Sequence, residues 1–121
     1  MSSEDTFFSA LSAAATVTAL VGTGTKIRIF PDYVPAETAL PAVAYTRAGT
    51  EYLNSISNAV LAQRATLEVW CLARKRPAAD SLADTITPVL AAANFLFTGR
   101  RTEFEPENGI WATILTVDHW A

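Results

Sequence analysis

The run from Val60 to Ala73 alternates between small or apolar side chains and polar or large ones. Such a period of two predicts a β-strand with one face on a core and the other face at solvent or a partner. The core-facing set is Leu61, Ala65, Leu67, Val69 and Cys71. The opposite set is Arg64, Thr66, Glu68 and Trp70.

Three further strands are predicted. One spans Lys26 to Phe30 and stops at Pro31, and another spans Leu40 to Ala48. The pair Asn108-Gly109, typical of a two-residue hairpin turn, separates a strand over 101–107 from one over 110–120. Counting outward from that turn places Phe104 opposite Thr113 and Thr102 opposite Leu115.

Two helical regions are expected. The first begins at a cap provided by Ser2 or Ser3, breaks near Thr16 and ends at Gly22. The second begins at Pro77, and its apolar stripe is Leu82, Ile86, Val89 and Leu90. Pro88 is expected to kink this helix or to end it near Ile86.

These elements predict one α+β domain over residues 1–121. We expect an antiparallel or mixed sheet of about four to five strands, packed against the N-terminal helical segment and the central helix.

Composition limits the partners. Nine Lys and Arg against twelve Asp and Glu give a net charge of −3, which disfavours tight nucleic-acid binding. Only 17% of the residues are charged, where about 25% is usual, so part of the surface is expected to be covered by other protein copies. The uncharged, apolar run from Phe7 to Val21 is too short for a membrane span, so a soluble protein made in the cytoplasm is expected.

Catalytic and metal chemistry is weakly supported. Cys71 and His119 form a conceivable thiolate–imidazole pair, but Cys71 falls on the predicted core face. Glycines in the segment Val21 to Lys26 are better explained by a helix cap than by a phosphate loop, because a strand follows. One cysteine and one histidine exclude an internal disulfide and disfavour zinc. We therefore expect no cofactor, no metal and no enzyme.

Candidate contact residues lie in three places. Trp70, with Thr66 and Glu68, is expected on an outward face of the long strand. A predicted loop from Gly49 to Asn58 includes Tyr52 and Asn54. The densest positive charges flank the central helix and are expected to pair with a neighbouring subunit: Arg74, Lys75, Arg76, Arg100 and Arg101.

Acidic residues alternate along the first strand of the closing hairpin. Glu103, Glu105 and Glu107 would share one face, which suits a solvated or lumen-facing stripe better than a metal site. On that face Glu103 is expected near Ile114 and Glu105 near Ala112.

The order of elements resembles the tail completion, or tail terminator, proteins of long-tailed bacteriophages and phage-derived gene transfer particles. The resemblance spans nearly the whole chain. It rests on segments 19–22 (ALVG), 27–31 (IRIFP), 40–46 (LPAVAYT), 64–71 (RATLEVWC), 83–84 (AD) and 115–120 (LTVDHW).

This resemblance implies a non-enzymatic virion subunit that assembles in the host cytoplasm. It implies a homo-oligomeric ring, a hexamer, at the head-proximal end of the tail tube. The ring stops tube polymerisation and offers a docking surface to the head connector. A lumen lined by Glu103 and Glu105 would let DNA pass without specific binding. The alternative is a head-side neck adaptor or stopper that binds the portal.

Overall fold

A computed structural model describes residues 2–35, 37–57 and 60–120, apart from the side chain of Leu61. The helices are α1 (Ser3–Ala13), α2 (Ala15–Val21) and α3 (Arg76–Ala92), with a 3₁₀ turn η1 (Gly24–Lys26). The strands are β1 (Ile29–Pro31), β2 (Ala42–Asn54), β3 (Val60–Ala73), β4 (Leu96–Glu105) and β5 (Ile110–Trp120).

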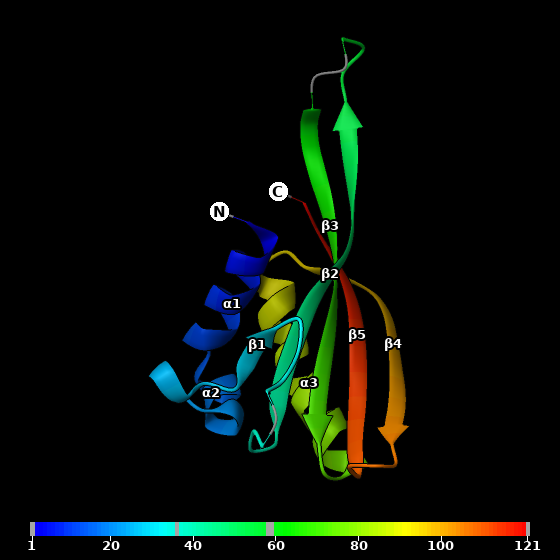
Figure 1. Ribbon diagram of the computed structural model, residues 1–121. Helices are drawn as coiled ribbons and strands as arrows, with labels where there is room; N and C mark the ends of the chain where they lie inside the picture. Colours follow the sequence, from blue (N-terminus) through cyan, green and yellow to red (C-terminus); the bar gives the residue numbers. More distant parts are fainter. Residues whose placement is uncertain (1, 36, 58–59, 121) are drawn as a thin grey trace.

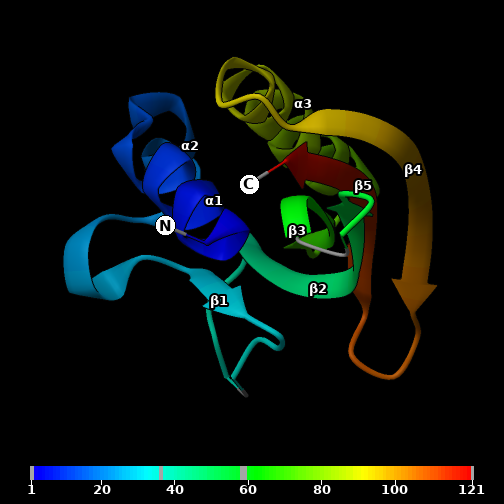
Figure 2. The same ribbon diagram turned by 90° about the horizontal axis from the view of Figure 1, so that it is seen from above.

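The strands form one mixed sheet in the order β1-β2-β3-β5-β4, in which only the β1–β2 pair is parallel. All three helices lie on one side of this curved sheet (Figures 1 and 2). The predicted α+β class, with helices packed against a mixed sheet, is therefore confirmed.

The core lies between the helices and the sheet. From β3 it receives the predicted face, with Ala65, Leu67, Val69 and Cys71 all buried. Phe7 of α1 packs against Tyr45 of β2 and Phe95, with ring centroids 4.6 Å and 6.1 Å away. These aromatic contacts attach α1 to β2 and to the segment before β4.

The N-terminal helical region agrees with the prediction except at its break. Ser2 caps α1 by accepting a hydrogen bond from the Asp5 N–H at 3.0 Å, and Gly22 ends α2 with a positive φ of 91°. The break falls at Ala14, whose backbone is extended, rather than at Thr16. The chain then forms η1, so the strand expected from Lys26 begins only at Ile29.

Pro88 neither ends α3 nor divides it, and the expected stop near Ile86 is wrong. The helix continues to Ala92 because the apolar stripe continues with it: Leu82, Ile86 and Leu90 are all buried. Packing of this face offsets the hydrogen bond that proline cannot donate.

The closing hairpin exists, but its predicted register is wrong by two residues. The last pair is Glu105 with Ile110, so Phe104 lies opposite Trp111 and Thr102 opposite Thr113. Four residues connect the strands rather than two, because the Glu105 carboxylate accepts hydrogen bonds from the N–H groups of Glu107 and Asn108, each at 2.9 Å. Glu107 therefore lies in the turn and not on the strand.

The predicted loop from Gly49 to Asn58 is largely strand. β2 continues to Asn54 and pairs with β3 as far as Val60, while Asn58 lies outside the described residues. Glycine, asparagine and serine indicated a loop, but cross-strand pairing with 60–66 overrides that weak preference.

Candidate functional site

The β2–β3 hairpin projects far beyond the rest of the molecule (Figure 1). Toward the tip of this hairpin, the pairing of β2 with β1 ends at Tyr45, and the pairing of β3 with β5 ends at Arg64. Beyond Arg64 the hairpin is a two-stranded ribbon. We call residues 49–64 the arm, of which 49–57 and 60–64 are described. A bare two-stranded ribbon is only marginally stable in water, which favours a partner around it.

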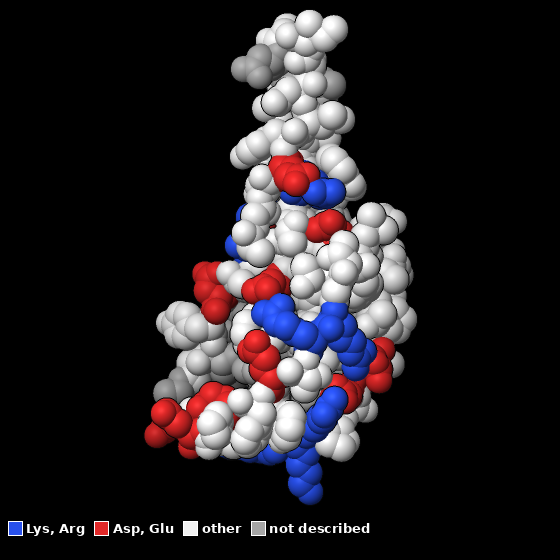
Figure 3. Space-filling view, turned by 90° about the vertical axis from the view of Figure 1, so that its right-hand side faces the viewer, with Lys and Arg blue, Asp and Glu red and all other residues white. Residues whose placement is uncertain are grey.

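The arm combines exposed apolar side chains with an absence of charged residues between Glu51 and Arg64. No Asp, Glu, Lys or Arg occurs between Glu51 and Arg64 in the sequence. Tyr52, Leu53 and Val60 are 58%, 53% and 55% exposed, and Ile56 is fully exposed. On the face that Figure 3 shows, the described part of this end carries no charged side chain, whereas acidic and basic side chains lie on the body and at the base of the arm. Such a surface is typical of a protein contact.

Ionic and aromatic contacts hold the base of the arm. Arg64 pairs with Glu51 across the ribbon, and its guanidinium lies 5.9 Å from the centre of the Trp120 ring. Arg47 donates to Glu4 of α1 at 3.1 Å and to the Thr50 hydroxyl at 2.9 Å. These contacts orient the arm relative to the body.

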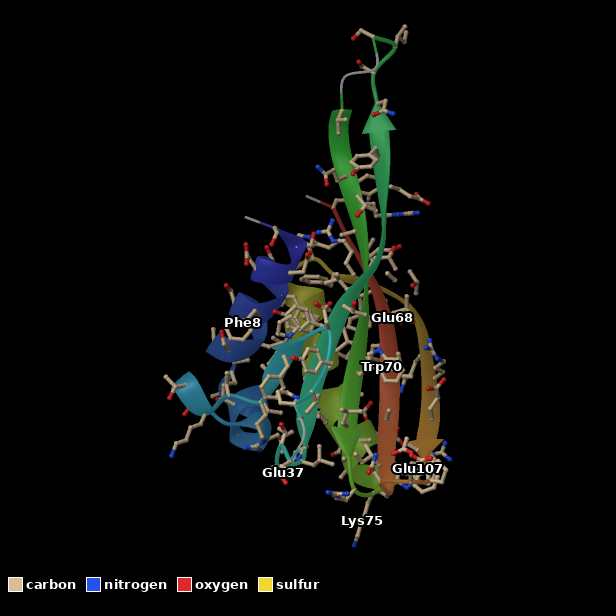
Figure 4. The ribbon with its side chains drawn as sticks, viewed as in Figure 1. Phe8, Glu37, Glu68, Trp70, Lys75 and Glu107 are labelled. Carbon is tan, nitrogen blue, oxygen red and sulfur yellow. The ribbon has the colours of Figure 1, made fainter. Side chains whose placement is uncertain are left out.

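Trp70 lies with Thr66 and Glu68 on the outward face of β3, as expected, but this face is half-buried rather than open. Figure 4 shows Trp70 and Glu68 on β3 in the middle of the sheet. The Arg101 guanidinium lies 5.9 Å from the Trp70 ring centre, and it bonds the Glu68 carboxylate at 3.3 Å. Thr66 donates to Asp118 at 2.7 Å.

The arginines around α3 have partners within the chain. Arg74 donates to the Asn108 carbonyl at 2.7 Å, and Arg76 lies 3.8 Å from the Asp80 carboxylate. Arg100 bonds Asp84 at 2.7 Å and Asp80 at 3.5 Å. These partners belong to the same subunit, and the expected contact of these arginines with a neighbouring subunit stays a prediction.

Glu103 and Glu105 keep the face expected of them, because a register error of two leaves the side-chain alternation unchanged. Both are exposed. Glu103 lies 3.5 Å from Arg101, and Glu105 closes its own turn. The charge of Glu103 is therefore partly neutralised by Arg101, whereas Glu105 has a structural role in the turn.

A groove of about 670 Å³ lies on the helix-free side of the sheet, and no sequence pattern indicated it. It forms between the segment before β2 and the β4–β5 hairpin, which meet only in the tertiary structure. Its floor and walls include Trp70, Leu72, Phe104 and Ile110, and Glu37 and Glu103 also line it. Glu37, Lys75 and Glu107 mark the end of the molecule opposite the arm (Figure 4).

A profile of the family described as "Tail completion protein gp17" matches residues 6–120. The chain belongs to this family. It is accordingly a structural protein of the tail of a phage or phage-like particle and assembles with other proteins of that particle. No curated protein matches the sequence.

The fold also occurs in a solved particle. The chain superposes on a chain from the structure titled "Virion of native gene transfer agent (GTA) particle" with a TM-score of 0.71. The match covers 93% of this chain and 88% of that chain at 15% identity. The likeness at this identity concerns the fold.

The structure of this tail completion protein separates the two residues considered for catalysis. Cys71 pairs with Thr113 of β5, whereas His119 lies opposite Ala65, so six residues along β5, roughly 20 Å, divide them. Cys71 is buried, and this burial raises the pKa of its thiol to about 12. His119 instead contacts the Ser3 hydroxyl through Nδ1 at 2.8 Å.

Within the described ranges, no group of three or more His, Cys, Asp or Glu side chains is arranged to hold a metal ion. No described helix is long and apolar enough to cross a membrane.

Proposed function

We propose that this tail completion protein forms a closed ring, a hexamer, on the head-proximal end of the tail tube. The ring ends tube polymerisation and presents a surface to the head connector. The observation that carries this proposal is the contrast between the two ends of the molecule. One end is the arm, which has exposed apolar side chains and no charge between Glu51 and Arg64, and the opposite end carries Glu37, Lys75 and Glu107.

The arm is the proposed tube contact, with Tyr52 and Asn54 on its strand. Exposed apolar side chains at one end favour a stable contact with another protein. The charged end suits the reversible docking of a filled head, because charged surfaces accelerate encounter more than they tighten binding. A ring also needs two different lateral patches on each subunit. The face with Thr66, Glu68 and Trp70 and the arginines at positions 74, 76, 100 and 101 supply candidates for one of them.

Electron microscopy of particles made without this protein tests the proposal. Tails of uncontrolled length that lack heads are expected, because nothing would stop the tube or join it. Normal tails beside unattached filled heads would instead favour the alternative, a head-side neck adaptor.

Shortening the arm tests its role in the same system. Replacing residues 52–63 with Asn-Gly joins Glu51 to Arg64, a pair that already lies opposite in the ladder, through a two-residue turn. The shortened protein should fold and form rings but leave tails uncapped. Normal capping by this variant would show that the arm does not contact the tube.

A further inference from the structure

The outer edge of β2 in the arm is an unprotected strand edge. Beyond Tyr45, no strand among the described residues pairs with β2 on the side away from β3. From Thr46 to Asn54 the edge is therefore open. Among the described residues, the corresponding open edge of β3 runs only from Val60 to Gln63, because the ladder with β5 starts at Arg64.

Backbone directions follow from the hydrogen bonds of the body. Val43 donates to the Arg28 carbonyl at 2.9 Å, and the Tyr45 carbonyl accepts from Asp32 at 2.8 Å, so these two residues of β2 face β1. Directions alternate along an antiparallel strand, and the irregularity between Arg47 and Gly49 shifts the alternation by one residue. Tyr52 therefore directs its N–H and C=O away from β3.

The other edge of the sheet, β4, has features that disfavour pairing with a further strand. β4 carries four charged side chains in ten residues, and its ladder is irregular between Phe97 and Gly99. Charges and bulges are the usual protection of an edge strand. The four charged residues are Arg100, Arg101, Glu103 and Glu105. The arm has no charged residue between Glu51 and Arg64.

We propose that the β2 edge of the arm, around Thr50 to Asn54, adds as a strand to an open sheet edge of the tail tube subunit. Backbone hydrogen bonds then give affinity, while Tyr52 and Leu53 insert on opposite faces of the joined sheet. The inference rests on the proposed function, since it names how the arm holds the tube.

A second copy is a less suitable partner for this edge. Six arms paired edge to edge would close a barrel of about twelve strands. This is fewer than the 16–18 strands with which porins enclose an aqueous channel, and barrel diameter falls with strand number. A channel narrower than that of a porin would obstruct a DNA duplex. Pairing of each arm with a tube subunit instead would leave the lumen open.

The test uses tail tubes purified from particles made without this chain, with capping followed by co-sedimentation and electron microscopy. Tyr52→Pro removes the outward N–H, and Tyr52→Ala removes the same ring while keeping that N–H. Gln63→Pro is the matched control on the β3 edge, where the N–H also faces away from the partner strand. Circular dichroism and thermal unfolding check that each variant folds.

Tyr52→Pro should raise the concentration needed to cap half of the tubes at least about tenfold above that of Tyr52→Ala, because the loss repeats in every subunit. Gln63→Pro should cap like the unaltered chain. Equal capping by the two Tyr52 variants would overturn the inference. So would loss of ring formation in Tyr52→Pro, which would make a second copy the partner. If the unaltered chain itself fails to cap tubes, the proposed function fails instead.

Hydrogen exchange gives a readout that needs no variant. Amides of residues 50–54 should exchange more slowly in capped tubes than in the free protein. Unchanged exchange in this segment would contradict strand addition.

Discussion

The side chain of Cys71 is fully buried in the core, where burial raises the pKa of the thiol to about 12. The thiol therefore stays protonated at neutral pH, and only the thiolate reacts quickly with alkylating reagents. We expect negligible labelling of the native protein by iodoacetamide at pH 7 and complete labelling in denaturant. Mass spectrometry measures both. Rapid labelling of the native state would reopen the possibility of a reactive cysteine.

His119 links the last strand to the first helix. Its ring stacks on Phe95 with centroids 4.4 Å apart, and burial lowers its pKa below the ordinary 6.5. Because the unfolded chain binds this proton more readily, the stability contributed by neutral His119 is present above pH 6.5 and declines as the pH falls below that value.

The melting temperature should accordingly fall between pH 7.5 and pH 5, and His119→Asn should reduce this dependence. Calorimetry across this range measures it. An equally steep decline in the variant would assign the pH dependence to other groups.

At the scale of the element, Pro88 is a local cost that packing of α3 offsets. Pro88→Ala restores a backbone donor in a helix interior and should stabilise the protein by about 1–3 kcal/mol. This corresponds to a rise in melting temperature on the order of 4–12 °C.

Pro77 provides the control for this substitution, because it lies in the first turn of the same helix. Its missing N–H has no helical acceptor there, so Pro77→Ala should change the melting temperature little. A lower melting temperature for Pro88→Ala would mean that the local backbone requires proline.

At the scale of the whole molecule, the acidic stripe tests the proposed lumen. Changing both Glu103 and Glu105 to Lys in every copy of a ring would replace repulsion of DNA with attraction. Genome ejection or particle maturation should slow, as measured by DNA release from purified particles. Because Glu105 also closes its turn, Glu105→Gln serves as the control for structural damage. Unaltered release in the double Lys variant would place these residues outside the DNA path.

Several features were predictable because they depend on neighbours in the sequence. Alternation from Ala65 to Cys71 identified the buried face of β3, and Ser2 and Gly22 marked the limits of the first helical region. The order of segments indicated the family, which the profile match confirms. Side-chain alternation and helix capping act within a few residues, so they can be recognised without the fold.

Tertiary structure decided what depends on partners distant in the sequence. The turn hydrogen bonds of Glu105 set the hairpin register, and pairing with 60–66 made the loop beginning at Gly49 into an arm. Packing of its apolar face allows α3 to continue beyond Pro88. Arg101 of β4 contacts Glu68 and Trp70 of β3, which lie far away in the sequence. A one-dimensional pattern states which face a side chain takes, but the length of a strand and the partner of a charge depend on which segments the fold brings together.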